Sequence, residues 1–159
     1  LGLEVGGRPQ LGLLDQPDMG VRFTGWRGGG RFDGEGEQRA LQVSSCQRLG
    51  QAILATTDPY LFAGAEQSAF TAVRERVRLC RYGFDAYAYA MLAAGGIDLV
   101  IESGLQIYDV QAFIPVVTGA GGVVTNWSGG DPSGGGQVVA AASADLLEQA
   151  LEYLASAAA

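Results

Sequence analysis

Three acidic residues in the middle of the chain have types and spacing that suit a divalent metal ion and a phosphate ester. They are Asp85, Glu102 and Asp109. Each is expected where a turn meets a regular element, so that their carboxylates can converge on one space. Carboxylate oxygens are the ligands that hard cations such as Mg²⁺ prefer. The spacing therefore favours metal-assisted chemistry on a small phosphorylated molecule.

The residue types that are missing restrict the chemistry further. The 159 residues include no histidine. This excludes Ser-His and Cys-His nucleophilic machinery and any His-ligated metal site within the sequence. The two cysteines, Cys46 and Cys80, lack a CxxC spacing, so we interpret them as buried reduced thiols rather than a disulfide or zinc site. Carboxylates, hydroxyls and backbone groups remain to perform any reaction.

Composition and charge indicate a globular chain whose partners are small. Hydrophobic residues make up 48% and charged residues 17% of the sequence, which is enough to bury one core. Ten basic against seventeen acidic residues give a formal charge of -7, which disfavours nucleic acid and anionic membranes as partners. The apolar runs are shorter than the roughly 20 residues that span a bilayer. We therefore expect a cytoplasmic protein that binds small molecules or metal ions.

The first third of the chain has the pattern of an antiparallel sheet. Apolar, β-prone runs are separated by turn-forming residues, which predicts a meander. The expected strands lie at residues 1–5, 11–15, 21–26 and 41–43. Because the alternation begins abruptly at Leu1, we expect the chain to be a fragment, and residues 1–48 to be the remainder of an N-terminal antiparallel-sheet domain.

From Ala52 onward strands and helices alternate, which predicts a layered α/β unit. We place the domain boundary near residues 45–51, so that residues 49–159 form a C-terminal α/β/α domain. Asp58 and Pro59 predict the start of a helix that runs to about Arg76. Further strands are expected at 51–56, 77–81, 97–102, 123–127 and 138–142, and further helices at 86–94 and 110–118 and at the C-terminal end.

The predicted elements place the three acids at element ends. Glu102 ends a buried strand, where ligands of open α/β sheets usually lie. Asp85 and Asp109 precede helices, whose N-terminal dipoles favour the ionised carboxylate. Since aspartate is also among the commonest N-caps, Asp58, Asp85 and Asp109 could each do no more than cap a helix. Their joint setting with Glu102 favours a site.

The same residues resemble the C-terminal half of the inositol monophosphatase family, most closely its histidinol-phosphate phosphatase branch. Tyr108-Asp109 matches the family's Trp-Asp signature with Tyr for Trp, and residues 85–90, Asp-Ala-Tyr-Ala-Tyr-Ala, resemble the histidinol-phosphate branch. The likeness extends over residues 1–127. Phe84 and Gln111 depart from the family pattern, at positions where a glycine and an alanine or isoleucine are usual.

The resemblance implies an α+β layered sandwich in which a partial antiparallel sheet precedes the α/β/α unit. It also implies that Asp109 is a ligand of Mg²⁺ and that Asp85 and Glu102 face the substrate. No residue of this chain beyond the metal ligand is implied to be catalytic.

The activity implied for the intact protein is Mg²⁺-dependent hydrolysis of L-histidinol phosphate to L-histidinol and phosphate, a step of histidine biosynthesis, by a homodimer. The family's metal-binding glutamate and its Asp-Pro-x-Asp-Gly-Thr segment have no counterpart in this sequence. We therefore expect the fragment to be inactive alone.

Two alternatives remain open. The first is an inositol monophosphatase or a broader sugar-phosphate phosphatase of the same family. The second is a truncated, non-catalytic module that binds a metal or a partner.

Overall fold

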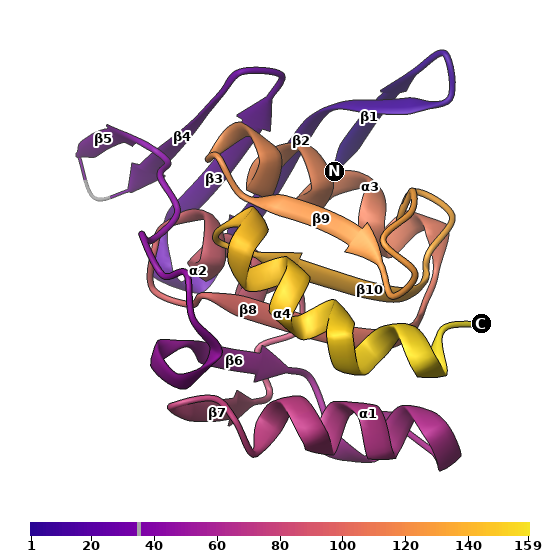
Figure 1. The fold of residues 1–159 in the computed structure, drawn as a ribbon. Helices are drawn as coiled ribbons and strands as arrows, with labels where there is room; N and C mark the ends of the chain where they lie inside the picture. Colours follow the sequence, from indigo (N-terminus) through magenta and orange to yellow (C-terminus); the bar gives the residue numbers. More distant parts are fainter. Residues whose placement is uncertain (35) are drawn as a thin grey trace.

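The computed structural model describes residues 1–34 and 36–159. Two β-sheets and four α-helices in this part of the chain form four layers (Figure 1). Sheet A is followed by helices α2 and α3, then by sheet B, and finally by helices α1 and α4. Apolar cores fill all three boundaries between layers. The predicted layered α/β class, with an antiparallel sheet first, is confirmed.

Sheet A is an antiparallel meander of consecutive strands. They are β1 Gly2–Val5, β2 Arg8–Gln16, β3 Val21–Trp26, β4 Gly29–Gly34 and β5 Glu37–Ala40. The glycine-rich strand β4 was not predicted. The strand expected at 41–43 is wrong, because the chain leaves the sheet after Ala40. The amide of Val43 donates instead to the carbonyl of Ala120, at the end of α3.

Sheet B has the strand order β7-β6-β8-β10-β9. The strands are β6 Ile53–Thr56, β7 Leu79–Tyr82, β8 Leu99–Leu105, β9 Val123–Asn126 and β10 Gly136–Ala141. Strands β7 and β8 both pair with β6 in parallel, whereas β10 runs antiparallel to β8 and β9. The centre of β8 is buried on both faces, as its unbroken apolar sequence predicts.

The helices are α1 Gly64–Arg74, α2 Ala86–Ala93, α3 Ile107–Gly119 and α4 Ala144–Leu154. The single helix expected from Asp58 to Arg76 is wrong. Asp58 caps only one 3-10 turn, Pro59–Leu61, in which its side chain accepts from the amide of Tyr60. The chain then extends at Phe62, whose buried ring stacks on Phe70 with centroids 4.2 Å apart.

Helix α3 lies very close to sheet A because glycines face it. A Cβ atom at Gly12 would overlap the carbonyl of Ala112, and one at Gly25 would overlap the backbone of Val116. On its opposite side, α3 places Phe113 in the core shared with sheet B. The helix is therefore fixed between the two sheets.

The proposed division into domains at residues 48 and 49 stays a prediction. Helices α2 and α3 contribute side chains to the core of each sheet. None of the helices in the described ranges is long and apolar enough to cross a membrane.

We predict that Gly25→Ala lowers the free energy of unfolding by about 1–3 kcal/mol, because the added methyl group must displace α3 from β3. Urea denaturation measures the change. Gly134→Ala is the control, since no atom lies within 4 Å of a Cβ at that loop position. Equal losses in the two variants would contradict the close-packing interpretation.

Candidate functional site

The three acids singled out in the sequence line one pocket of about 350 Å³. Asp85 precedes α2, Glu102 lies in β8, and Asp109 belongs to the first turn of α3. The remaining lining residues are Thr57, Leu61, Ala86, Tyr89, Ser103, Gly104, Leu105 and Phe113. The structure thus brings together residues that are 24 positions apart in sequence. Their roles as metal and substrate ligands stay predictions.

Glu102 lies inside strand β8, not at its end as expected. Strand β8 continues to Leu105 because it pairs there with β10, whereas its parallel neighbour β6 stops at Thr56. Glu102 is therefore level with the loop after β6. Its Oε1 atom accepts from the amide of Thr57 at 2.7 Å and from the Thr57 hydroxyl at 2.9 Å.

The second oxygen of Glu102 is buried without a hydrogen-bond partner in the described part of the chain. The residue as a whole is 1% exposed. Burial raises the pKa of this carboxyl. The hydrogen bonds from Thr57 and the nearby hydroxyl of Thr56 oppose the rise, and the negative charge of Asp85 adds to it. A donor that entered the pocket would stabilise the ionised form.

Asp85 does not cap α2 with its side chain, so the capping alternative is wrong for this residue. Its backbone has φ 46° and ψ -137°, and among the described residues it is the one non-glycine with positive φ. Such a conformation costs about 1–3 kcal/mol and is found where function or tight packing requires it. Asp85 lines the pocket instead of bonding the helix end.

Asp109 is exposed and is the third residue of α3. We expected it just before a helix that begins at residue 110, but the helix begins at Ile107. Its Oδ2 atom accepts from the amide of Gln106 at 2.8 Å. The capping interpretation therefore holds for one oxygen. The other, Oδ1, accepts no hydrogen bond from the described residues, and the helix N-terminus favours its negative charge.

The sequence interpretation missed Tyr89, Thr57 and Phe113 as pocket residues. Tyr89 of α2 follows Asp85 by four positions, and both residues line the pocket. That spacing could have indicated it, but the alanine-rich helix suggested packing only. Thr57 gave a weaker signal. It follows the end of β6, and its position beside Glu102 can be recognised only from the pairing register of β6 and β8.

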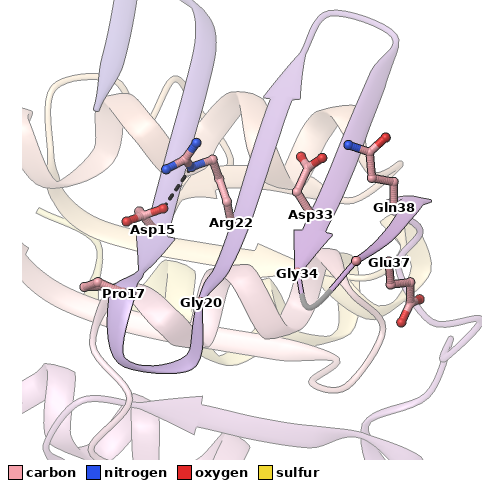
Figure 2. Close-up of a pocket in the computed structure, with 9 residues that line it drawn as sticks. Asp15, Pro17, Gly20, Arg22, Asp33, Gly34, Glu37 and Gln38 are labelled. Atoms are coloured by element: carbon pink, nitrogen blue, oxygen red, sulfur yellow. Dashed lines mark hydrogen bonds and ion pairs between the residues drawn. The ribbon is translucent and has the colours of Figure 1, made fainter.

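A second hollow, of about 520 Å³, lies on the outer face of sheet A, and none of the three acids lines it. Figure 2 shows Asp15 of β2 and Arg22 of β3 side by side in it. They form an ion pair of 2.8 Å in which both side chains are largely exposed. Such surface pairs contribute little to stability or binding. The pocket beside β8, which the three acids line, is therefore the candidate site.

Comparisons with known proteins agree on one family. The model of the inositol monophosphatase family matches residues 1–159. The chain is 45% identical over 157 residues to the bifunctional phosphatase IMPL2, chloroplastic, of Arabidopsis thaliana, covering 93% of this chain and 44% of that protein. It is 33% identical to a histidinol-phosphatase of Streptomyces coelicolor, covering 95% and 58%.

A solved structure of an inositol monophosphatase from Zymomonas mobilis has the same fold. Its TM-score is 0.89 at 36% identity, covering 96% of this chain and 60% of that one. The chain spans about half the length of the curated relatives it matches.

We predict that Glu102→Gln becomes more stable relative to the unchanged protein as pH rises. The folded protein holds the Glu102 proton at a higher pH than the unfolded chain, so between the two pKa values unfolding releases a proton and stability falls with rising pH. Glutamine keeps an acceptor for Thr57 without this penalty. Urea denaturation from pH 4 to 8 measures the difference, with the exposed Glu148→Gln as control. If the stability difference between Glu102→Gln and the unchanged protein did not vary with pH, the raised pKa of Glu102 would be refuted.

We also predict that Asp85→Gly is more stable than Asp85→Ala by about 1 kcal/mol, because glycine adopts positive φ without strain. Both variants remove the carboxylate, so their difference isolates the backbone. Thermal denaturation of the pair measures it, and an alanine variant as stable as the glycine variant would show that Asp85 is unstrained.

Proposed function

Because the chain belongs to the inositol monophosphatase family, we propose that the intact protein is a metal-dependent phosphatase that hydrolyses L-histidinol phosphate. The observation that supports this choice of substrate is the set of residues that line the pocket. It contains three carboxylates and no lysine or arginine among the described residues. The names of the Arabidopsis and Streptomyces relatives, a bifunctional phosphatase and a histidinol-phosphatase, support the same class of reaction.

The acidic lining favours an alcohol that carries a positive charge. Histidinol phosphate bears an ammonium group on the carbon adjacent to the one that carries the phosphate ester. Asp85 and Glu102 would pair with that group, which would otherwise lose its hydration without compensation. These two residues are therefore assigned to substrate binding, and the phosphate to the side of the pocket nearer Asp109.

Asp109 has the properties of one ligand of Mg²⁺. Its carboxylate is exposed, lies at a helix N-terminus and keeps one oxygen free of hydrogen bonds from the described residues. The described residues include no group of three or more His, Cys, Asp or Glu side chains that could hold an ion. The chain therefore fits Mg²⁺ as a contributor of one ligand, and the remaining ligands would come from water, from the phosphate ester and from the rest of the intact protein.

Bound Mg²⁺ activates water and neutralises charge on the phosphoryl oxygens of such an ester. The chain's own residues bind and orient the alcohol. Thr57 holds Glu102 in place through two hydrogen bonds, and Gln106 fixes the carboxylate of Asp109. Leu61, Leu105 and Phe113 form the apolar walls against which the rest of the alcohol would pack.

Inositol monophosphate is the second candidate substrate. The likeness to the Zymomonas mobilis inositol monophosphatase favours it, and the hydroxyls of inositol could donate to the same carboxylates. A homodimer, a cytoplasmic location and the non-catalytic alternative stay predictions.

We predict that Asp109→Asn lowers kcat/KM of the intact protein at least 100-fold while the fold is retained, because asparagine can still accept from Gln106 but binds a cation poorly. Phosphate release from L-histidinol phosphate and from inositol monophosphate, each with Mg²⁺, measures the effect. The matched control is Asp145→Asn, which removes an acid from the first turn of α4.

Turnover of L-histidinol phosphate that collapses in Asp109→Asn alone supports the proposal. Preference for inositol monophosphate selects the second candidate. The absence of turnover of either ester by the intact protein would favour another phosphate ester or a non-catalytic module.

A further inference from the structure

Two buried polar atoms of the pocket have no hydrogen-bond partner in the described residues. They are the hydroxyl oxygen of Tyr89 and the Oε2 atom of Glu102. A buried polar atom that stays unpaired costs about 1–3 kcal/mol. The Thr56 hydroxyl near Glu102 is also unpaired, but Thr56 does not line the pocket, so a group bound in the pocket could supply the hydrogen bonds that Tyr89 and Glu102 lack.

The Tyr89 hydroxyl is held firmly. Its ring is 2% exposed and stacks on Phe113 of α3, with centroids 3.6 Å apart and planes 3° from parallel. The ring cannot swing out to water without breaking this stack, so the hydroxyl stays in a fixed, buried place in a residue that lines the pocket.

The surroundings keep Tyr89 neutral. Burial raises the pKa of its phenol well above the usual range, and the negative charges of Glu102 and Asp109 add to the rise. A neutral phenol can accept a hydrogen bond through its oxygen as well as donate one. The pocket therefore offers a phenol oxygen and a carboxylate oxygen, both of which can accept from a single group with several protons.

We propose that Tyr89 is a specificity-determining residue, whose hydroxyl oxygen accepts a hydrogen bond from the ammonium group of an amino-alcohol phosphate while Oε2 of Glu102 accepts another. This assignment rests on the proposed function and names its substrate class, a phosphate monoester with an amine on the carbon adjacent to the one that carries the ester. An ammonium has three protons, so it can donate to more than one oxygen at once. Hydrogen bonds to charged groups are stronger than those between neutral groups.

The test compares Tyr89→Phe with the unchanged intact protein. The probes are L-histidinol and its deamino analogue, 3-(imidazol-4-yl)propan-1-ol, with binding measured by calorimetry without metal. We expect Tyr89→Phe to weaken binding of L-histidinol about tenfold or more and to leave binding of the deamino alcohol unchanged. The melting temperature should stay the same or rise, because the stack on Phe113 remains and an unpaired hydroxyl is removed.

Tyr87→Phe is the matched control. Tyr87 lies on the same helix but outside this pocket, with its ring against Phe23. This variant should bind both alcohols as the unchanged protein does.

The inference is overturned if Tyr89→Phe weakens both alcohols equally, if it weakens neither, or if the unchanged protein does not prefer the amine. Steady-state hydrolysis of L-histidinol phosphate and its deamino analogue separates this failure from that of the proposed function. Turnover with an unaltered preference in Tyr89→Phe removes the role of Tyr89 alone, whereas amine-selective binding without turnover removes only the activity.

Discussion

Helix α3 lies against sheet A at a distance that glycine alone permits, and the position of the candidate site depends on this contact. Gly12 and Gly25 of sheet A face the helix backbone, and Gly119 at the helix end meets the carbonyl of Gly29. Because the other side of α3 packs into the core of sheet B, the helix cannot move without disturbing both sheets. The backbone packing of α3 therefore places the helix that carries Asp109 and Phe113.

The site is assembled from elements that meet only in three dimensions. A strained residue before α2, the middle of β8 and the first turn of α3 each supply one carboxylate. Every acid is held differently: Glu102 by two hydrogen bonds from Thr57, Asp109 by the amide of Gln106, and Asp85 by its backbone conformation. Burial raises the pKa values of Glu102 and Tyr89, and the neighbouring negative charges add to the rise. A positively charged group would therefore suit this pocket.

Local sequence signals predicted the element types and the three acids well. The alternation in residues 1–26, the buried run before Glu102 and the helix expected at 110–118 all correspond to observed structure. The errors arose where contacts with residues distant in the sequence decide the extent of a strand or helix. Strand β8 runs past Glu102 because β10 pairs with it, and the helix after Asp58 is interrupted because Phe62 is drawn into the core. The unpaired hydroxyl of Tyr89 follows from the stack on Phe113, which no local pattern reveals.

The unequal lengths of two neighbouring strands have a further consequence. Strand β6 stops at Thr56, level with the end of β7 at Tyr82, while β8 continues to Leu105, so the edge of sheet B has a step beside β8. Had β6 continued beside it, the Glu102 carboxylate would have met another strand. The step instead leaves space at the edge of sheet B, where the amide of Thr57 meets the carboxylate of Glu102. Lengthening or shortening a single strand would thus be enough to close or widen the entrance for a ligand, without rebuilding either core.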